Sequence, residues 1–369
     1  MTTFTDLVRM LRPAGGGVHV VSTGVQELQA LQKRIYSAAD ATEIDSKWRD
    51  AIQNLSDAKV CILGVPSDTG AGFTRGANRA PGAIREHLLQ TPEHSIWHPS
   101  VVDLGDVYTV PHYLYDELLS DQQKNMTAQV FYGGDAHGRP VSPLDICEAA
   151  LRYGYTENPD LVPIVIGGDH SVGWPAFKAA YDHWESHRGR RIGLLHFDAH
   201  TDLLKERLGV RYCFATWAYH ANELLGRDGR LVQVGIRTSG RTRDHWESTL
   251  GVRQYWAEEA NERGADSLVA EIADRFKRLN VDALYVSNDI DGTDPAFAAA
   301  TGTPEPGGLT PGLVSALTRE LGEHFPLIGG DLVEVAPPLA GDLEGEPTTT
   351  LNTAAAYVAD LVELGLRHS

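Results

Sequence analysis

Residues 192–202 read IGLLHFDAHTD, an apolar run that ends abruptly in acids and a histidine. The run Ile192–Phe197 shows no alternation of apolar and polar residues, as expected for a strand that helices cover on both faces. Amphipathic stretches separate it from similar runs, and strands that alternate with helices indicate a parallel α/β sheet. The other runs are Val60–Val65, Val162–Ile166, Leu231–Ile236, Ala283–Val286 and Leu327–Val335, and we expect a last helix over Leu351–Leu366.

Composition limits the classes of function. The chain has 369 residues, 42% of them apolar, and a formal net charge of −18. A chain this acidic lacks the basic face that nucleic acid or an anionic membrane surface requires. Three scattered cysteines predict neither a disulfide framework nor a thiolate zinc site. The sequence shows no signal-peptide pattern and no apolar run of membrane-spanning length, so we expect a cytoplasmic protein.

The first 57 residues differ from the rest. Residues 26–36 and 45–55 have helical spacing, and a run of three glycines precedes them. We therefore expect a helical N-terminal extension over residues 1–57 and one catalytic domain over residues 58–369. The extension carries no recognisable chemistry and is interpreted as an oligomer contact or as a cover over the main domain.

Polar residues gather where three of the predicted strands end, which is where sites form in such sheets. After Ile166 the chain reads GGDHS (167–171), in which Asp169 either supports His170 or simply caps a helix. After Phe197, the residues Asp198, His200 and Asp202 share one face of an extended segment. His196 has the same parity but lies earlier in the strand, where we expect it to be buried. A solvated acidic strand end is the alternative for 198–202.

The third strand end reads SNDIDGTDP (287–295). Asp289 and Asp291 share a face there, and acids this close repel one another unless cations compensate them. A turn rich in Asx caps is the alternative. Six nitrogen and oxygen ligands over the three segments match a site for two divalent ions, and they favour manganese, nickel, cobalt or iron. The candidate ligands are His170, Asp198, His200, Asp202, Asp289 and Asp291.

These segments resemble the ureohydrolase family, which includes arginases, agmatinases and guanidinobutyrases. Two further stretches carry the resemblance, GVPSDTGAGFTRGANRAPGAIR (64–85) and DLVEVAPP (331–338), and the 287 segment continues it to residue 308. The resemblance covers residues 58–369. It implies a three-layer α/β/α fold with a mostly parallel eight-stranded sheet, and a homo-oligomer, either a trimer or a hexamer.

The resemblance also implies roles for the candidate ligands. His170, Asp198, Asp202 and Asp289 would hold one metal ion, and Asp198, His200, Asp289 and Asp291 the other. A hydroxide that bridges the ions would attack the guanidinium carbon, and urea would leave. Glu334 matches the family's glutamate that pairs with the guanidinium N–H groups, which suits bidentate geometry. A surface acid at a strand end is the alternative for Glu334.

The sequence departs from the family after residue 202. Relatives carry a proton-shuttling histidine where this chain has Phe214, so His220 is a candidate substitute, with a plain packing histidine as the alternative. The aromatic residues of this region, Tyr212, Phe214, Trp217 and Tyr219, either narrow the pocket around a small cation or belong to the core. Thr216, Trp217 and Asn288 are candidate substrate contacts.

With these departures and its N-terminal extension, the sequence is most similar to the nickel-dependent guanidine hydrolase branch of the family. The expected reaction is hydrolysis of guanidine to urea and ammonia, with nickel favoured, manganese as the alternative, and a nickel metallochaperone as a possible partner. A substituted guanidine such as 4-guanidinobutyrate, agmatine or the biguanide metformin is the alternative substrate, and Arg75, Asn78 or Arg79 could receive a carboxylate tail. The other classes considered are a metal-dependent deacetylase of the same fold and a noncatalytic partner subunit.

Overall fold

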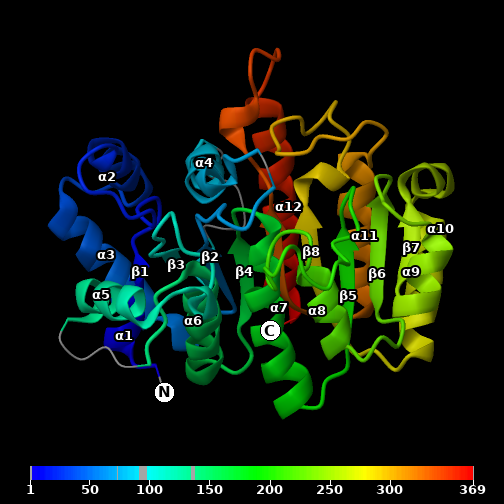
Figure 1. Ribbon diagram of the computed structural model, residues 1–369, viewed down its shortest axis with the longest axis horizontal. Coiled ribbons are helices and arrows are strands. Elements are labelled where there is room, and N and C mark those ends of the chain that lie inside the picture. Colours follow the sequence, from blue (N-terminus) through cyan, green and yellow to red (C-terminus); the bar gives the residue numbers. More distant parts are fainter. Residues whose placement is uncertain (1, 73, 91–97, 134–137, 369) are drawn as a thin grey trace.

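The computed structural model describes residues 2–72, 74–90, 98–133 and 138–368. Its centre is a nine-stranded sheet in the order β1-β3-β2-β4-β9-β8-β5-β6-β7 (Figure 1). Eight strands are parallel, and the short β1 runs antiparallel to β3 at one edge. The strands are β1 Leu11–Arg12, β2 Val60–Gly64, β3 Val101–Val107, β4 Val162–Ile166, β5 Ile192–Phe197, β6 Leu231–Ile236, β7 Arg253–Trp256, β8 Ala283–Asp289 and β9 Leu327–Val333.

The predicted α/β architecture is confirmed, with one more strand than the eight expected. All six apolar runs form strands, because each is buried on both faces of the sheet. The ninth strand, β1, comes from the N-terminal segment that was expected to be helical only. Its two residues pair with Val107 and Asp106 of β3, so the N-terminal segment extends the sheet itself.

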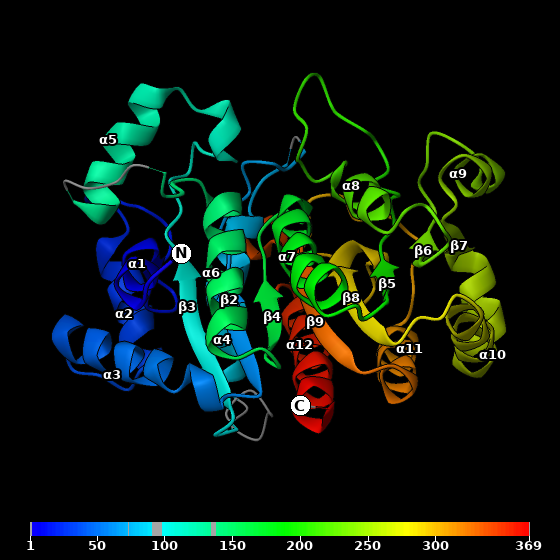
Figure 2. The ribbon, with the colours of Figure 1, turned by 90° about the horizontal axis from the view of Figure 1, so that it is seen from below.

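Helices cover both faces of the sheet in three layers (Figure 2). One apolar core lies under α6, α7 and α8, and a second lies under α4, α10, α11 and α12. The covering helices are α4 Ala80–Leu88, α6 Pro143–Glu157, α7 Gly173–Tyr181, α8 Trp217–Leu224, α10 Ala257–Arg278, α11 Pro311–His324 and α12 Thr348–His368. Two more, α5 Asp121–Tyr132 and α9 Arg243–Leu250, lie toward the two ends of the sheet. None of the described helices is long and apolar enough to cross a membrane.

The N-terminal segment lies against the β3 edge of the sheet (left in Figure 1). It contains α1 Phe4–Met10, α2 Val25–Ile35 and α3 Ala41–Gln53, the last two close to the predicted helices. Trp48 is buried and donates its indole N–H to the Leu104 carbonyl at 2.9 Å. The buried carboxylate of Asp106 accepts the backbone N–H groups of Gly15 and Gly17 and also binds Arg85 at 2.6 Å. The segment therefore shares its core and its polar contacts with the rest of the chain. Its treatment as a separate unit stays a prediction.

The sheet order brings the predicted site segments together. Strands β4, β9, β8 and β5 are neighbours and parallel, so their carboxyl ends open at one edge of the sheet. The residues that follow these four strands include His170, Glu334, Asp291 and Asp198. Four segments that are distant in sequence thus meet at one place, as expected for a parallel sheet.

Candidate metal centre

The turn after β4 positions His170. Gly168 passes so close to residue 67 that an added Cβ would lie 1.7 Å from the Ser67 carbonyl oxygen, so only glycine fits. Asp169 accepts the backbone N–H groups of Ser171 at 2.8 Å and Gly70 at 3.0 Å, which caps the short 3₁₀ helix His170–Val172. The cap interpretation of Asp169 is therefore correct. Because Asp169 also binds Gly70, it connects this turn to the 64–85 segment.

The His170 ring faces three carboxylates. Its Nδ1 lies 3.0 Å from Asp289 Oδ2, 3.2 Å from Asp202 Oδ2 and 3.5 Å from Asp198 Oδ2. The other ring nitrogen, Nε2, lies 3.0 Å from the Ser287 hydroxyl. His170 is thus at the centre of the cluster, and the alternative of an incidental histidine is not supported.

A hydrogen-bond chain determines which nitrogen of His170 is free. The Ser287 hydroxyl donates its one hydrogen to Asp331 at 2.6 Å, so it can only accept from His170 Nε2. With the ring hydrogen on Nε2, the lone pair of Nδ1 points at the three carboxylates. This arrangement, in which one imidazole nitrogen is held by a hydrogen bond and the other is open, is typical of metal-binding histidines.

A second group of side chains lies beside the first and shares Asp198 with it. His200 Nδ1 lies 3.1 Å from Asp291 Oδ2 and 3.5 Å from Asp198 Oδ1. The two oxygens of Asp198 therefore face different histidines, Oδ2 toward His170 and Oδ1 toward His200. The two oxygens of Asp289 also have different neighbours. Oδ2 lies near His170, and Oδ1 accepts the backbone N–H of Asp291 at 2.9 Å. All six predicted ligands converge in this way.

The charges of the cluster fit a pair of divalent cations. Burial and the charges of Asp291 and Asp198 raise the pKa of Asp289 well above its ordinary value, and burial and Asp198 raise the pKa of Asp202. Burial opposes the ionisation of Asp198, but the neighbouring imidazoles of His170, His196 and His200 hold its pKa well below the usual range. Buried carboxylates that repel one another in this manner are stabilised by metal ions, and carboxylate with imidazole is the donor set that such ions prefer.

Two side chains of the site stand on strained backbone. Asp202 has φ 51° and Glu334 has φ 62°, which is the left-handed region that residues other than glycine seldom adopt. Strain of this kind is concentrated at functional sites. The Oε1 atom of Glu334 accepts the backbone N–H of His170 at 2.8 Å, while an added Cβ at Gly302 would lie 3.8 Å from Oε2. Burial and the nearby charge of Asp169 raise the pKa of Glu334 well above its ordinary value.

Trp217 and Thr216, which were expected to contact substrate, lie behind the ligands. The indole N–H of Trp217 donates to Asp202 Oδ2 at 3.0 Å, and its ring stacks on His170 with centroids 4.5 Å apart. The Thr216 hydroxyl is bonded within its own loop, to the backbone of Arg211 and Cys213. Both residues are fully buried. In this position Trp217 supports two candidate ligands, and Thr216 holds the loop that leads into α8.

Asn288 points away from the cluster. It lies between Ser287 and Asp289 on β8, and both of those side chains contact His170. Alternate residues of a strand face opposite sides, so Asn288 faces the α11–α12 side, in register with Phe197 and Leu332. The expectation that Asn288 contacts substrate is therefore wrong, and the strand period could have corrected it. Its buried Oδ1 has no hydrogen-bond partner among the described residues.

His220 is not brought to the cluster. Its Nε2 lies 3.1 Å from the carbonyl oxygens of Lys205 and Arg211, and its ring packs against Trp174 and Tyr212. Burial lowers the pKa of His220. Over the residues that the structure describes, no contact joins His220 to a candidate ligand. This geometry matches the alternative of a packing histidine, which here holds the loop before α8.

Phe214 lies between the loops at the site. An added Cβ at Gly72 would lie 3.5 Å from the Phe214 ring, and the backbone N–H of Phe214 donates to the Gly70 carbonyl at 3.1 Å. The guanidinium carbon of Arg207 lies 5.0 Å from the centre of the same ring. The 64–85 segment and the segment after Asp202 are thus joined directly at Phe214.

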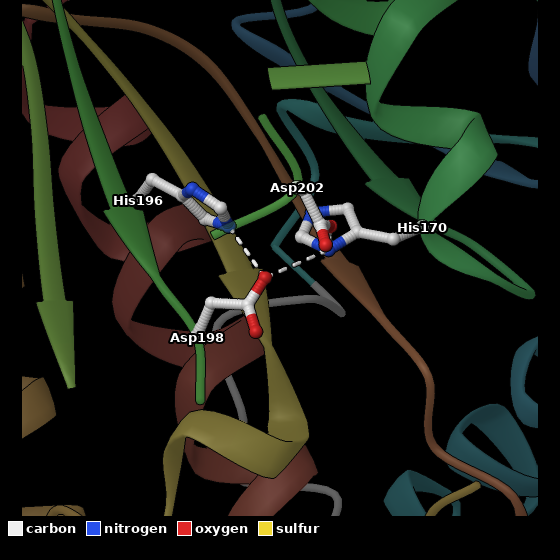
Figure 3. Close-up of side chains that lie close together, drawn as sticks. All are labelled: His170, His196, Asp198 and Asp202. Carbon is white, nitrogen blue, oxygen red and sulfur yellow. Dashed lines mark hydrogen bonds and ion pairs between the residues drawn. The ribbon is translucent and has the colours of Figure 1, made fainter. Parts of the chain in front are cut away.

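Several contributors were missed from the sequence. Figure 3 shows His196 on the other side of the Asp198 carboxylate from His170, with His196 Nε2 2.8 Å from Asp198 Oδ2. Thr303 donates to Asp291 Oδ2 at 3.0 Å, and Glu305 Oε1 lies 3.9 Å from His200 Nε2. The parity of His196 with Asp198 was a usable signal. The positions of Thr303 and Glu305 depend on the course of a long loop, which local pattern does not predict.

A three-layer α/β fold with clustered carboxylates and imidazoles at the carboxyl ends of its strands is typical of metal-dependent hydrolases. The sequence model of the Arginase family matches residues 58–362, so the chain belongs to the arginase family of hydrolases that act on guanidino C–N bonds. Members of this family depend on two metal ions, and the cluster is the candidate site for them.

Named relatives agree with this assignment. The chain is 37% identical to a guanidinobutyrase of Pseudomonas aeruginosa, over 75% of this chain and 78% of the relative. It is 34% identical to an agmatinase of Proteus mirabilis, over 76% and 81%. Among solved structures, proclavaminate amidino hydrolase from Streptomyces clavuligerus superposes with a TM-score of 0.65 at 29% identity, covering 84% of this chain and 92% of that one.

Proposed function

We propose that this enzyme hydrolyses free guanidinium to urea and ammonia, and that His170, Asp198, His200, Asp202, Asp289 and Asp291 hold two divalent ions. Nickel is the preferred ion and manganese the alternative, since the nitrogen and oxygen donors suit both. The observation that carries the substrate assignment is Phe214, which packs on the turn at Gly72 and joins the two loops at the site. An aromatic ring in that place supports a small pocket that excludes a long tail.

The residues of the chain would bind and orient the substrate. Glu334 is buried, and its Oε1 is held by the His170 backbone N–H, so Oε2 is directed to accept from a guanidinium N–H. A bound guanidinium would favour the ionised form of this carboxylate, against the effect of burial on its pKa. Two bound divalent ions would supply Lewis-acid activation of a water molecule, which no side chain here supplies by itself.

A guanidino acid such as 4-guanidinobutyrate is the second candidate, and two observations favour it. The named relatives include a guanidinobutyrase and a guanidinopropionase, whose substrates carry carboxylate tails. Arg207, beside the Phe214 ring, provides a positive charge that would attract such a tail and repel the amine of agmatine. Of the three tail-binding candidates in the 64–85 segment, Arg79 pairs with Glu27 at 3.5 Å, while Arg75 donates to the Thr69 carbonyl.

Urea release decides between the two candidates. Protein loaded separately with Ni²⁺ and Mn²⁺ would receive guanidine, 4-guanidinobutyrate, agmatine, arginine or metformin at equal concentration. The proposal expects the highest kcat/KM for guanidine, and Phe214→Ala should lower that preference by admitting tailed substrates. Preferential turnover of 4-guanidinobutyrate that falls in Arg207→Ala would establish the second candidate instead. A trimer or hexamer, a cytoplasmic location and a nickel metallochaperone stay predictions.

A further inference from the structure

A row of polar side chains crosses three buried strands beside the cluster. His196 of β5, Gln233 of β6 and Gln254 of β7 are directly opposite one another in register, and all three are fully buried. Gln233 Nε2 lies 3.0 Å from His196 Nδ1, and Gln254 Nε2 lies 2.9 Å from Gln233 Oε1. The row ends at Trp256, whose indole nitrogen lies 3.2 Å from Gln254 Oε1. His196 and Gln233 each lie between two apolar residues of their strands, so this buried polar row requires an explanation.

Both ends of the row determine the direction of its hydrogen bonds. At the outer end, the Trp256 indole can only donate, so the oxygen of Gln254 faces it and the amide nitrogen faces Gln233. At the inner end, one side-chain atom of Gln233 faces both His196 Nδ1 and the Thr201 carbonyl oxygen, the latter at 2.7 Å. A carbonyl oxygen can only accept a hydrogen bond, so this atom of Gln233 must be a donor. That atom is therefore the amide nitrogen. The two ends give the same orientation independently.

The tautomer of His196 follows from this orientation. Its Nδ1 accepts from the Gln233 amide, so the ring hydrogen is on Nε2, and Nε2 donates to Asp198 Oδ2 at 2.8 Å. The lone pair of the ring is already used, which leaves none for a metal ion. His170 shows the reverse arrangement, because the Ser287 and Asp331 pair leaves its Nδ1 open toward the carboxylates.

We infer that His196 is a positioning residue for Asp198, the candidate ligand that faces both His170 and His200, and is not itself a metal ligand, and that Gln233 and Gln254 set the tautomer of His196. Asp198 is then held at both oxygens by N–H donors, Oδ2 by His196 and Oδ1 by the backbone of His200 at 2.6 Å. A carboxylate oriented in advance loses less freedom when it binds metal, and a fully satisfied buried network is rigid. The inference rests on the metal site of the proposed function but not on its substrate.

The test measures the affinity of the full-length protein for Mn²⁺ and the number of ions bound per chain, with no substrate present. Gln233→Met removes the amide at nearly constant volume, and we expect it to weaken binding by about 10-fold or more, as for other side chains that orient metal ligands. Gln254 lies one strand further from the ligands in the row, so Gln254→Met should weaken Mn²⁺ binding less. Asn222→Leu is the matched control, because it removes a buried amide of α8 whose one hydrogen-bond partner among the described residues is the Leu250 carbonyl. It should leave the affinity unchanged.

Two His196 variants separate positioning from ligation. His196→Gln places an amide N–H near the former Nε2 and should retain both ions with near-normal affinity, whereas His196→Phe should bind them more weakly. Loss of one ion in His196→Gln, as expected for His170→Gln, would identify His196 as a ligand and overturn the inference. Normal affinity in both Gln233→Met and Gln254→Met would also overturn it. If His196→Phe does not fold, the affinities of Gln233→Met and Gln254→Met decide the question. Failure to turn over guanidine would not alter any of these readouts.

Discussion

Trp217 donates its indole N–H to Asp202 at 3.0 Å while the Asp202 backbone stands in the left-handed region at φ 51°. The same indole stacks on the His170 ring. One aromatic side chain thus orients two candidate ligands that come from different strand ends. The sequence suggested that this tryptophan narrows the substrate pocket, but its contacts are on the ligand side.

Trp217→Phe should keep the ring against His170 and lose the hydrogen bond to Asp202. We expect metal affinity to fall by about 10-fold or more, with a parallel loss of activity that excess metal restores in part. Titration with Mn²⁺ and urea release at several metal concentrations would measure this. Trp174→Phe is the control, since Trp174 stacks on Tyr212 and makes no contact with a ligand among the described residues. Equal effects in the two variants would show that only packing is involved.

Asp289→Ala should remove both metal ions, because the two oxygens of Asp289 face the His170 group and the Asp291 backbone. The measurement is metal content per chain after loading and desalting. Asp294→Ala provides the control from the same segment, since the Asp294 carboxylate accepts backbone N–H groups of residues 296, 307 and 308 and has no contact with a candidate ligand side chain among the described residues. An Asp289→Ala protein that retains two ions and full activity would contradict the site assignment.

The sheet and the clustering of the candidate ligands were predictable because both depend on short patterns. Continuous apolar runs identified β2, β4, β5, β6, β8 and β9, and polar residues at the ends of such strands identified the six side chains that converge. The strands β3 and β7 were missed because Asp103 and Asp106 in one, and Arg253 and Gln254 in the other, interrupt the apolar pattern. Those polar residues are explained only by tertiary partners such as Arg85 and Gln233.

The residues near the ligands were less predictable. The roles of His220 and Trp217 depend on the path of the loop after Asp202, which no local periodicity describes. Asn288 is different, because the strand period places it opposite Ser287 and Asp289. The expectation for Asn288 followed a family comparison where the period would have been the better guide.

Glu334→Gln should retain both metal ions and lose most activity. The amide oxygen can still accept the His170 backbone N–H, so the site should keep its shape. The charge that pairs with a guanidinium is lost, and we expect kcat/KM to fall by about 100-fold, or about 3 kcal/mol for charge-assisted hydrogen bonds. Metal analysis and urea release on the same sample would test this. Normal turnover would remove Glu334 from substrate binding.

A last prediction concerns stability away from the metal site. Burial, and then the charge of Asp116, raises the pKa of Asp145 to about 6 in the folded chain. The folded state therefore binds this proton more tightly than the unfolded state does, and stability falls as pH rises from about 4 to about 6. The loss is at most about 3 kcal/mol, and partial exposure of Asp145 reduces it.

Asp145→Asn should remove that loss, because an amide oxygen can accept the Asp116 N–H and the Ser142 hydroxyl as Asp145 does now. The melting temperature of the variant relative to the natural chain should rise between pH 4 and pH 7, measured with chelator present so that metal binding does not contribute. Asp121→Asn is the control of opposite sign, since the Lys124 ammonium lowers the pKa of exposed Asp121. A difference for Asp145→Asn that does not change with pH would show that folding leaves the pKa of Asp145 unshifted.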